Sequence, residues 1–347
     1  MSNKKCYVPV LKWKKGEQEA LKNLTSDQKT KIIPLIEITD YQDPISILKS
    51  LHSCYANPIF IDTIIAAEDD RDFLLSIVRE SKENNQQVFP VFYFDDFPEV
   101  IKPFIEYVEH IGIRVPIPED IEGPSYEELF KTIKEFKDNN NILIDIILDL
   151  NVITDRKEAN RQLSEVKNVI QNFLLNRSFY NSIIISSTSL PESISSVPAG
   201  GQASFLRYDI MLFKRIYEFP MFDGIKNKLI YSDYGVTKFT DTEIDFSRIK
   251  YILPKIKYTT YNEYLVLKGQ KDNRTKETIK GYVDLSKEIL SSKYYFGENF
   301  SFGDLEIKER AYGLNGKGPG SNTNWVTIAA NHHIAVVVEQ LSKFFGI

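Results

Sequence analysis

Charged residues end several short apolar runs of this chain. If the runs are parallel strands that close into a ring, their carboxyl ends meet at one rim, where barrel enzymes place their active sites. Carboxylates gathered there can hold Mg²⁺ or Mn²⁺ or divide acid and base roles, and a lysine there can bind a phosphate or a carboxylate. Each residue can instead be structural, as an ion pair inside the barrel or as a helix cap. The residues are Lys12, Glu37, Asp62, Asp95, Asp149 and Asp233.

Two polar segments extend this candidate site. The tripeptide Ser232-Asp233-Tyr234 is the most suggestive strand end, because it places three polar groups together. Lys14 and Glu17 follow the first apolar run, in a loop that would face the same rim, and are therefore predicted to bind a ligand. The alternative for this loop is a solvated connection in which Glu17 stabilises the N-terminus of the next helix.

A glycine-rich segment, residues 313–325, leads into an expected helix and contains Lys317. Its glycines and the helix N-terminus would suit an anion, although the spacing matches no nucleotide motif, and a flexible loop is the alternative. His332 lies in the same expected helix as Trp325 and is a candidate general base or phosphate ligand, or else a core histidine. No HExxH or HxxxH pattern occurs, so zinc is not expected.

Residues 248–280 are rich in lysine and tyrosine, with nine basic and three acidic residues. Basic residues interleaved with aromatic ones suit a single-stranded nucleic acid, through phosphate contacts and stacking. The same pattern suits an amphipathic hairpin whose tyrosines cover a barrel. The candidate contacts are Lys255, Lys257, Tyr258 and Lys268.

The apolar runs recur at intervals of roughly 25–35 residues, the length of a β-α unit. They begin near residues 7, 31, 58, 87, 112, 141, 181 and 228. Strands that alternate with helices pair in parallel, so the sequence predicts an α/β fold with a (β/α)8 TIM-like barrel; an open sheet is the alternative. The fifth run, 113–117, is the weakest because Pro116 interrupts it.

Helix signals lie between the runs. Asp43 and Pro44 read as an N-cap and first helical residue, and Ser125 with Glu128 reads as a capping box. Further helices are expected at 96–108, 161–175 and 205–217, and His52 and His110 are expected on helix surfaces.

The pattern changes near residue 241. We expect a barrel over 1–240 and, over 241–347, a C-terminal α+β extension with a tyrosine-rich hairpin at 249–269, the glycine-rich loop and a final helix at 322–345. Residues 248–347 hold 15 basic and 10 acidic residues, a net charge of +5, whereas residues 1–247 hold 28 and 38, a net charge of −10. The sequence thus predicts an acidic barrel with a basic extension.

Composition narrows the class of protein. No apolar run reaches the roughly 18 residues of a membrane span, and no signal peptide is recognisable, so we expect a cytoplasmic protein without a membrane partner. Cys6 and Cys54 are too few for a disulfide framework and fit a reducing compartment. The net charge of −5 argues against a general nucleic-acid binder.

The opening YVPVLKWKKGEQEAL, followed by IIPLIEI, resembles the phage-type "beta protein" family of phage and bacterial genomes. The resemblance extends over nearly the whole chain and implies an accessory protein of phages and mobile elements, without an established reaction. Its later motifs are Arg207 with Asp209, YSDYG at 231–235, Phe302-Gly303-Asp304, and Thr323 and Trp325 followed by Asn331-His332-His333. Among these residues, Arg207, Tyr234 and Trp325 are candidate ligand contacts.

Two functions follow as hypotheses. The first is recognition of a phage or host protein or nucleic acid, in antiphage defence or counter-defence. The second is a barrel enzyme that acts on a phosphorylated or nucleotide-like substrate, with Mg²⁺ or Mn²⁺ at the rim and His332 or Lys317 completing the site. The alternative to both is a structural accessory protein whose barrel lacks a working site.

Overall fold

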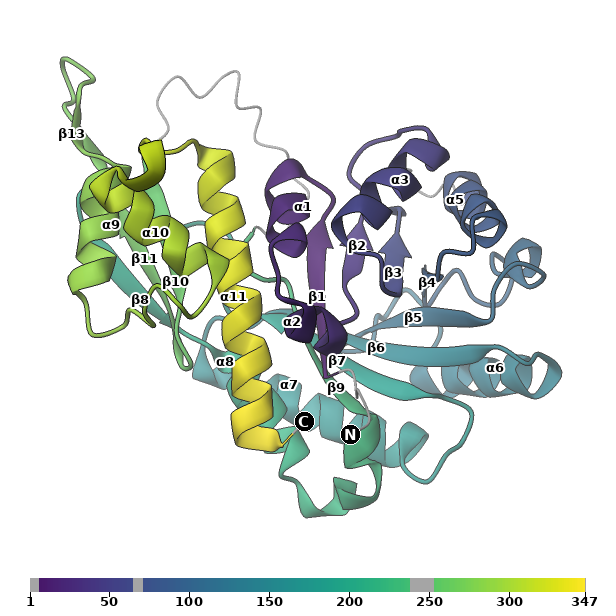
Figure 1. The fold of residues 1–347 in the computed structure, drawn as a ribbon. Helices are drawn as coiled ribbons and strands as arrows, with labels where there is room; N and C mark the ends of the chain where they lie inside the picture. The colour runs from purple at the N-terminus through teal and green to yellow at the C-terminus, as the bar shows by residue number, and fades with distance from the viewer. Residues whose placement is uncertain (1–5, 65–70, 238–252, 347) are drawn as a thin grey trace. The chain divides into compact units, whose positions relative to one another are not determined.

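Eight parallel strands form a closed barrel in the order β1-β2-β3-β4-β5-β6-β7-β9 (Figure 1). The computed structural model describes residues 6–64, 71–237 and 253–346. Each barrel strand begins within a few residues of a predicted apolar run, and the predicted (β/α)8 TIM-like barrel is confirmed. The strands are β1 (Tyr7–Lys12), β2 (Leu35–Glu37), β3 (Ile59–Asp62), β4 (Val88–Tyr93), β5 (His110–Pro116), β6 (Leu143–Val152), β7 (Ser182–Thr188) and β9 (Leu229–Asp233).

The chain divides into two compact units. The barrel unit comprises Met1–Trp13, Lys29–Ser189 and Tyr208–Tyr234. The α+β unit comprises Lys14–Gln28, Leu190–Arg207 and Gly235–Ile347. It therefore takes in two segments that precede the expected extension, and the expected boundary near residue 241 lies outside the described residues.

Two helices of the barrel unit begin at caps that the sequence predicts. The Asp43 carboxylate accepts the N–H of Ser46 at 2.9 Å, and Ser125 and Glu128 form a reciprocal capping box, so both predicted caps are confirmed. Pro44 is the first residue of its helix. The segments are α2 (Ser26–Lys31), α3 (Pro44–Cys54), α5 (Asp72–Glu83), α6 (Tyr126–Asn139), α7 (Arg156–Val169) with the π-helix η2 (Ile170–Leu174), α8 (Tyr208–Tyr217), and the 3₁₀ helices η1 (Lys102–Phe104) and η3 (Pro220–Lys228).

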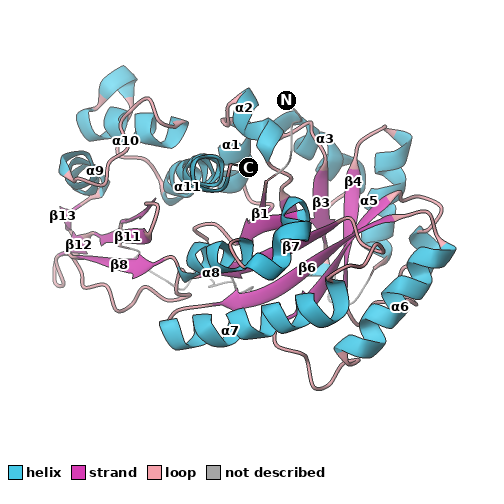
Figure 2. Cartoon of the chain, turned by 90° about the horizontal axis from the view of Figure 1, so that it is seen from below, coloured by secondary structure: helices cyan, strands magenta, loops and turns pink. Residues whose placement is uncertain are grey.

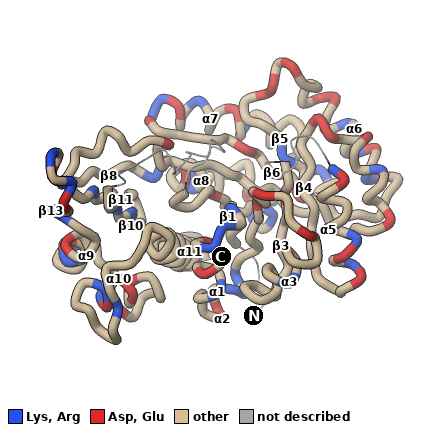
Figure 3. Tube along the Cα trace, turned by 90° about the horizontal axis from the view of Figure 1, so that it is seen from above, with Lys and Arg blue, Asp and Glu red and all other residues tan. Residues whose placement is uncertain are grey.

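The outer helices are amphipathic. Figure 2 shows α6 and α7 lying along the outside of the barrel strands, and Figure 3 shows that charged residues gather on these helices while the strands are mostly uncharged. The helix α6 buries Leu129, Phe130 and Ile133, and all seven residues of β7 are buried. The apolar faces of the helices therefore cover a barrel wall that is itself apolar.

Two predicted helices differ in the structure. Residues 96–108 form turns and η1 instead of a helix, because the Asp96 carboxylate accepts the N–H of Tyr93 at 2.9 Å and pairs with Arg71, which turns the chain back at the end of β4. The helix predicted at 205–217 begins only at Tyr208, since the preceding residues belong to strand β8.

The prediction for His110 is also wrong. This residue begins β5, and its Nε2 lies 2.7 Å from the Asp145 carboxylate. Asp145 also accepts hydrogen bonds from Asn181 and Ser182, at 2.8 and 2.7 Å, so a polar cluster closes the N-terminal ends of β5, β6 and β7. The strand β5 is regular because Pro116 is its last residue, where the missing N–H interrupts no further pairing.

The α+β unit contains a three-stranded antiparallel sheet, β10-β11-β8. The predicted hairpin is confirmed over its described part, while residues 249–252 lie outside it. The elements are β8 (Gln202–Leu206), β10 (Lys255–Thr259), β11 (Glu263–Lys268), β12 (Gln270–Lys271), β13 (Thr278–Lys280), α1 (Lys15–Lys22), α9 (Tyr282–Ser291), α10 (Phe302–Tyr312), η4 (Leu314–Gly316) and α11 (Asn322–Phe345).

Helix α11 is at the centre of the α+β unit. Its Thr327 hydroxyl donates to the Gly16 carbonyl of α1 at 3.0 Å, and its Asn331 donates to the carbonyl of Ala20 at 3.1 Å. On the α10 side, a Cβ at Gly303 would lie 2.4 Å from the carbonyl oxygen of Ile328. The glycine of the Phe302-Gly303-Asp304 motif is therefore required by the close approach of α10 to α11.

Candidate functional site

The barrel strands bring polar residues together at their carboxyl ends. Glu37 pairs in register with Asp62 on β3 and with Lys12 on β1, and Tyr93 pairs with Arg114 on β5. Because parallel strands end at one rim, side chains that are distant in the sequence become neighbours there. Three of the predicted carboxylates, those of Glu37, Asp62 and Asp149, meet in this way.

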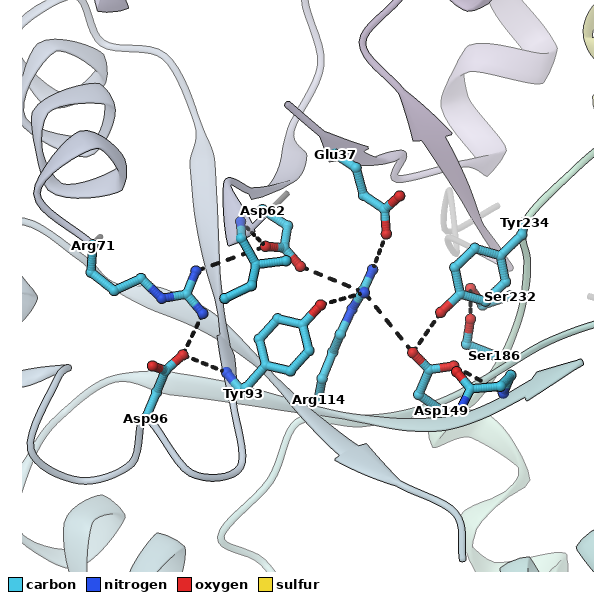
Figure 4. Close-up of polar contacts among 12 residues, drawn as sticks. Glu37, Asp62, Arg71, Tyr93, Asp96, Arg114, Asp149, Ser186, Ser232 and Tyr234 are labelled. Atoms are coloured by element: carbon cyan, nitrogen blue, oxygen red, sulfur yellow. Dashed lines mark hydrogen bonds and ion pairs between the residues drawn. The ribbon is translucent and has the colours of Figure 1, made fainter. Parts of the chain in front are cut away.

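Arg114 lies where the three carboxylates converge (Figure 4). Its Nη2 donates to Glu37 Oε1 at 2.9 Å, and its Nη1 lies 3.6 Å from Asp62 Oδ2 and 3.9 Å from Asp149 Oδ2. Nη1 also donates to the Tyr93 hydroxyl at 3.0 Å. Arg114 is buried, with 5% of the residue exposed. Its guanidinium therefore supplies the positive charge that balances the three carboxylates.

A second arginine extends the cluster. Arg71 pairs with Asp96, and its Nη1 lies 3.8 Å from Asp62 Oδ1, so Asp62 lies between two guanidinium groups. On the opposite side of Arg114, the Tyr234 hydroxyl donates to Asp149 (Figure 4). The rim thus combines four carboxylates, two guanidiniums and two phenols.

Burial controls the proton affinities of this cluster. Burial is the largest influence on Glu37 and raises the pKa of its carboxyl; Arg114 opposes this shift and Asp62 adds to it. Burial also raises the pKa of Tyr93 and Tyr234, so both phenols are neutral; Tyr93 accepts from Arg114 and Tyr234 donates to Asp149. For Arg114, burial acts to lower the pKa, but the surrounding phenols and carboxylates raise it well above the usual value. Glu37 therefore holds its proton more tightly than an exposed glutamate does.

Five buried polar atoms at this rim make no hydrogen bond within the described residues. They are Asp62 Oδ2, Thr63 Oγ1, Arg71 Nε, Arg71 Nη1 and Arg114 Nε. Buried polar groups in native proteins nearly always have partners, so this concentration makes the rim a candidate ligand site. In the described part of the chain, no three His, Cys, Asp or Glu side chains are placed to hold a metal ion.

Two other predicted strand-end residues lie apart from Arg114. Asp233 is fully buried and accepts hydrogen bonds from the hydroxyls of Tyr7 and Tyr231, at 2.7 and 2.9 Å. Asp95 is exposed in the turn after β4. Asp233 therefore joins β1 to β9 by hydrogen bonds to tyrosines.

The remaining predicted ligand residues belong to the α+β unit. Lys14 is exposed and Glu17 is buried at the start of α1. Arg207 is fully buried and donates to the Thr260 carbonyl and to Gln340, each at 3.0 Å. These positions fix Arg207 to the sheet and to α11.

Side-chain contacts hold the glycine-rich loop against neighbouring residues. Lys317 pairs with Glu306 and Glu309 of α10, and the indole N–H of Trp325 donates to the Pro319 carbonyl at 3.0 Å. Arg310 pairs with Glu306 at 2.8 Å. The loop is consequently held against α10 by ion pairs that already engage Lys317.

His332 is fully buried. Its Nδ1 lies 2.7 Å from Asp304 and its Nε2 lies 2.8 Å from the Thr259 carbonyl, and its ring stacks on Tyr258 at 4.0 Å. Asp304 also accepts hydrogen bonds from Tyr258 and from Ser301, the N-cap of α10. Both imidazole nitrogens are thus engaged inside the core of the α+β unit.

The residues predicted to contact nucleic acid are also engaged within this unit. Tyr258 is 1% exposed and has no face open for stacking on a base. Lys257 donates to the Val236 carbonyl, and Lys268 donates to the Val197 carbonyl at 3.0 Å. Lys255 is an exposed residue at the start of β10.

Sequence reasoning missed Arg114, Tyr93, Arg71 and Thr63. The available signal for Arg114 was a single cation within the apolar run HIGIRVP, a position where an unpaired charge would be very costly. Thr63 directly follows Asp62 at the end of β3 and carried no signal of its own.

No helix in the described part of the chain is both long and apolar enough to cross a bilayer. Comparison with curated proteins gave no match. A family model described as Beta protein matches residues 7–339, which is nearly the whole chain. The resemblance of the sequence is confirmed, and this chain belongs to the Beta protein family.

Proposed function

We propose that the barrel rim binds a small neutral molecule with several hydroxyl groups, such as a sugar or a polyol. The observation that carries this proposal is the group of five buried polar atoms without hydrogen bonds on Asp62, Thr63, Arg71 and Arg114. Arg71 and Arg114 can only donate, Asp62 can only accept when ionised, and Thr63 can do both. A hydroxyl both donates and accepts, so adjacent hydroxyls satisfy all of these atoms together.

The charges at the rim favour a neutral ligand over a phosphorylated one. Four carboxylates face two guanidiniums and the Lys12 ammonium, and the guanidiniums are already paired with carboxylates. A phosphate would meet carboxylates that repel it. The metal-dependent enzyme on a phosphorylated substrate, predicted from the sequence, is therefore the less favoured form of this site.

The site also holds groups for proton transfer. Burial raises the pKa of Glu37, and the neighbouring Asp62 carboxylate accepts the backbone N–H of Ile64 at 3.0 Å. Two carboxyl groups in different environments can divide the roles of acid and base. In the proposed site Glu37 donates or receives a proton at a ligand hydroxyl, while Arg114 orients the ligand.

Replacing Thr63 with valine is expected to weaken binding of a neutral ligand about tenfold, the effect of one lost hydrogen bond. The measurement is isothermal titration calorimetry with D-ribose, D-glucose and myo-inositol, and with ribose 5-phosphate as the charged counterpart. Stability should be unchanged or slightly higher, since the Thr63 hydroxyl makes no hydrogen bond within the described residues.

Ser342→Ala provides the matched control, because Ser342 Oγ is also buried without a hydrogen bond in the described residues but lies on α11. It should leave binding unchanged. The proposal fails if none of the neutral ligands binds, if only ribose 5-phosphate binds, or if both variants lose affinity equally.

We further propose, as a second function, that the protein recognises an acidic phage or host partner through the arm formed by β12 and β13. This arm carries Lys271 and Arg274, and its Ile279 is 58% exposed. The Asp272 carboxylate accepts the backbone N–H groups of Arg274 and Thr275 at 2.8 and 2.7 Å, so it is occupied inside the turn. The exposed surface of the arm is therefore basic and partly apolar.

Reversing the charge of both basic residues, K271E with R274E, is expected to abolish any effect of the protein on phage plaque number in an expressing bacterial host. The physical reason is that like charges repel an acidic partner. The control is K131E with K134E on α6, where both lysines are exposed and pair with acidic residues of their own helix. Equal loss in both double variants, or no effect of the wild-type protein on plaques, would contradict this role.

A further inference from the structure

An open cavity of about 580 Å³ lies in the α+β unit at the turn between β10 and β11. The turn itself and residues 293–296, which follow α9, form its walls. Its lining combines aromatic rings with polar side chains. The aromatic residues are Tyr261, Tyr294, Tyr295 and Phe296.

Two of the aromatic walls are fixed by hydrogen bonds. The Tyr261 hydroxyl donates to Glu339 at 2.6 Å, and the Tyr295 hydroxyl donates to the Asp304 carbonyl at 3.1 Å. Phe296 packs edge-on against Tyr261, with ring centroids 5.2 Å apart. The rings are therefore held in place before any ligand arrives, which lowers the entropic cost of stacking on them.

Among the polar residues of the cavity, the Thr260 hydroxyl is hydrogen-bonded to the backbone of Glu263, whereas the other side chains are less engaged. Within the described residues, the Glu263 carboxylate and the Asn262 side-chain amide make no hydrogen bond or ion pair. Lys293 is exposed, and its ammonium lies 5.2 Å from the centroid of the Tyr294 ring. An acceptor-only group, an amide and a cation thus border one aromatic cavity.

We propose that this cavity binds a guanine nucleotide. A planar base stacks on aromatic side chains whatever its identity, so the rings supply affinity. The carboxylate of Glu263 selects a base edge that presents adjacent N–H donors, as guanine does and adenine does not. The ammonium of Lys293 neutralises the phosphate. This site is separate from the barrel rim and does not depend on the function proposed there.

The test is isothermal titration calorimetry of the full chain with GMP, AMP and guanosine. GMP should bind with one-to-one stoichiometry and about tenfold more tightly than AMP, the discrimination expected of a bidentate base contact. Glu263→Gln should bring the two affinities close together. Lys293→Ala should weaken GMP but leave guanosine unchanged.

Glu277→Gln is the matched control, since Glu277 lies in the exposed loop between β12 and β13. It should bind GMP as the wild type does, and so should Thr63→Val at the barrel rim. The proposal is overturned if GMP gives no binding at millimolar concentration, if GMP and AMP bind the wild type equally, or if E263Q and E277Q behave alike.

Discussion

Replacing Arg114 with methionine should lower the free energy of unfolding of the barrel by about 3–5 kcal/mol. Arg114 is the only described cation that contacts Glu37, Asp62 and Asp149 together, and each of these three residues is at most 9% exposed. Without it, Glu37 and Asp149 lose the guanidinium that contacts them, and Asp62 keeps only its longer contact with Arg71 at 3.8 Å. The measurement is urea denaturation followed by far-UV circular dichroism.

The control for this variant is Arg161→Met. Arg161 also pairs with a carboxylate, that of Glu158, but 47% of its side chain is exposed. Exposed pairs contribute about 0–1 kcal/mol, so the control should be nearly as stable as the wild type. Equal losses in the two variants would show that Arg114 does not compensate the buried carboxylates.

The deficit of Arg114→Met should also shrink as pH falls from about 7 to about 5. Arg114 opposes the rise that burial imposes on the pKa of Glu37, so its removal raises that pKa further. A carboxyl whose folded pKa exceeds its unfolded value contributes stability at low pH and loses it as pH rises. A deficit that grows on acidification would contradict this account.

Replacing Asp304 with alanine should destabilise the α+β unit by about 3–5 kcal/mol. Asp304 is fully buried and accepts hydrogen bonds from the hydroxyls of Tyr258 and Ser301, and it lies 2.7 Å from His332 Nδ1. Its loss leaves these groups buried without an acceptor. Thermal and urea unfolding followed by tryptophan fluorescence report the change, since Trp325 lies in this unit.

Asp284→Ala is the matched control. Asp284 and Asp304 occupy the same position, the third residue of their helices, but Asp284 accepts only the exposed N–H of Gly281. Loss of such a cap costs about 1 kcal/mol. If both alanine variants lost stability to the same extent, the contribution of Asp304 would be a capping effect and not a buried network.

The sequence predicts the barrel well because its signals are local. Apolar runs, Pro44 at a helix start and the Ser125 capping box all act over a few residues. The helix predicted at 96–108 fails for the opposite reason, since its first turn is decided by the contact of Asp96 with Arg71, 25 residues away.

The candidate site depends on register, which the sequence does not show. Glu37 and Arg114 meet although 77 residues separate them, because three intervening strand pairings place them at one rim. Asp233, which looks equivalent to Glu37 in the sequence, binds tyrosines instead. A strand-end carboxylate therefore identifies the rim but not its neighbours.

The contact between α1 and α11 has a consequence for the order of events during synthesis. Gly16 and Thr327, which share a hydrogen bond, are 311 residues apart. At 5–20 residues per second, a ribosome needs roughly 15–60 s to make the chain between them. Ala20 and Leu21 are buried in the native protein, and the Ala20 carbonyl accepts a hydrogen bond from α11. The α+β unit can therefore complete its core only after α11 has emerged from the ribosome.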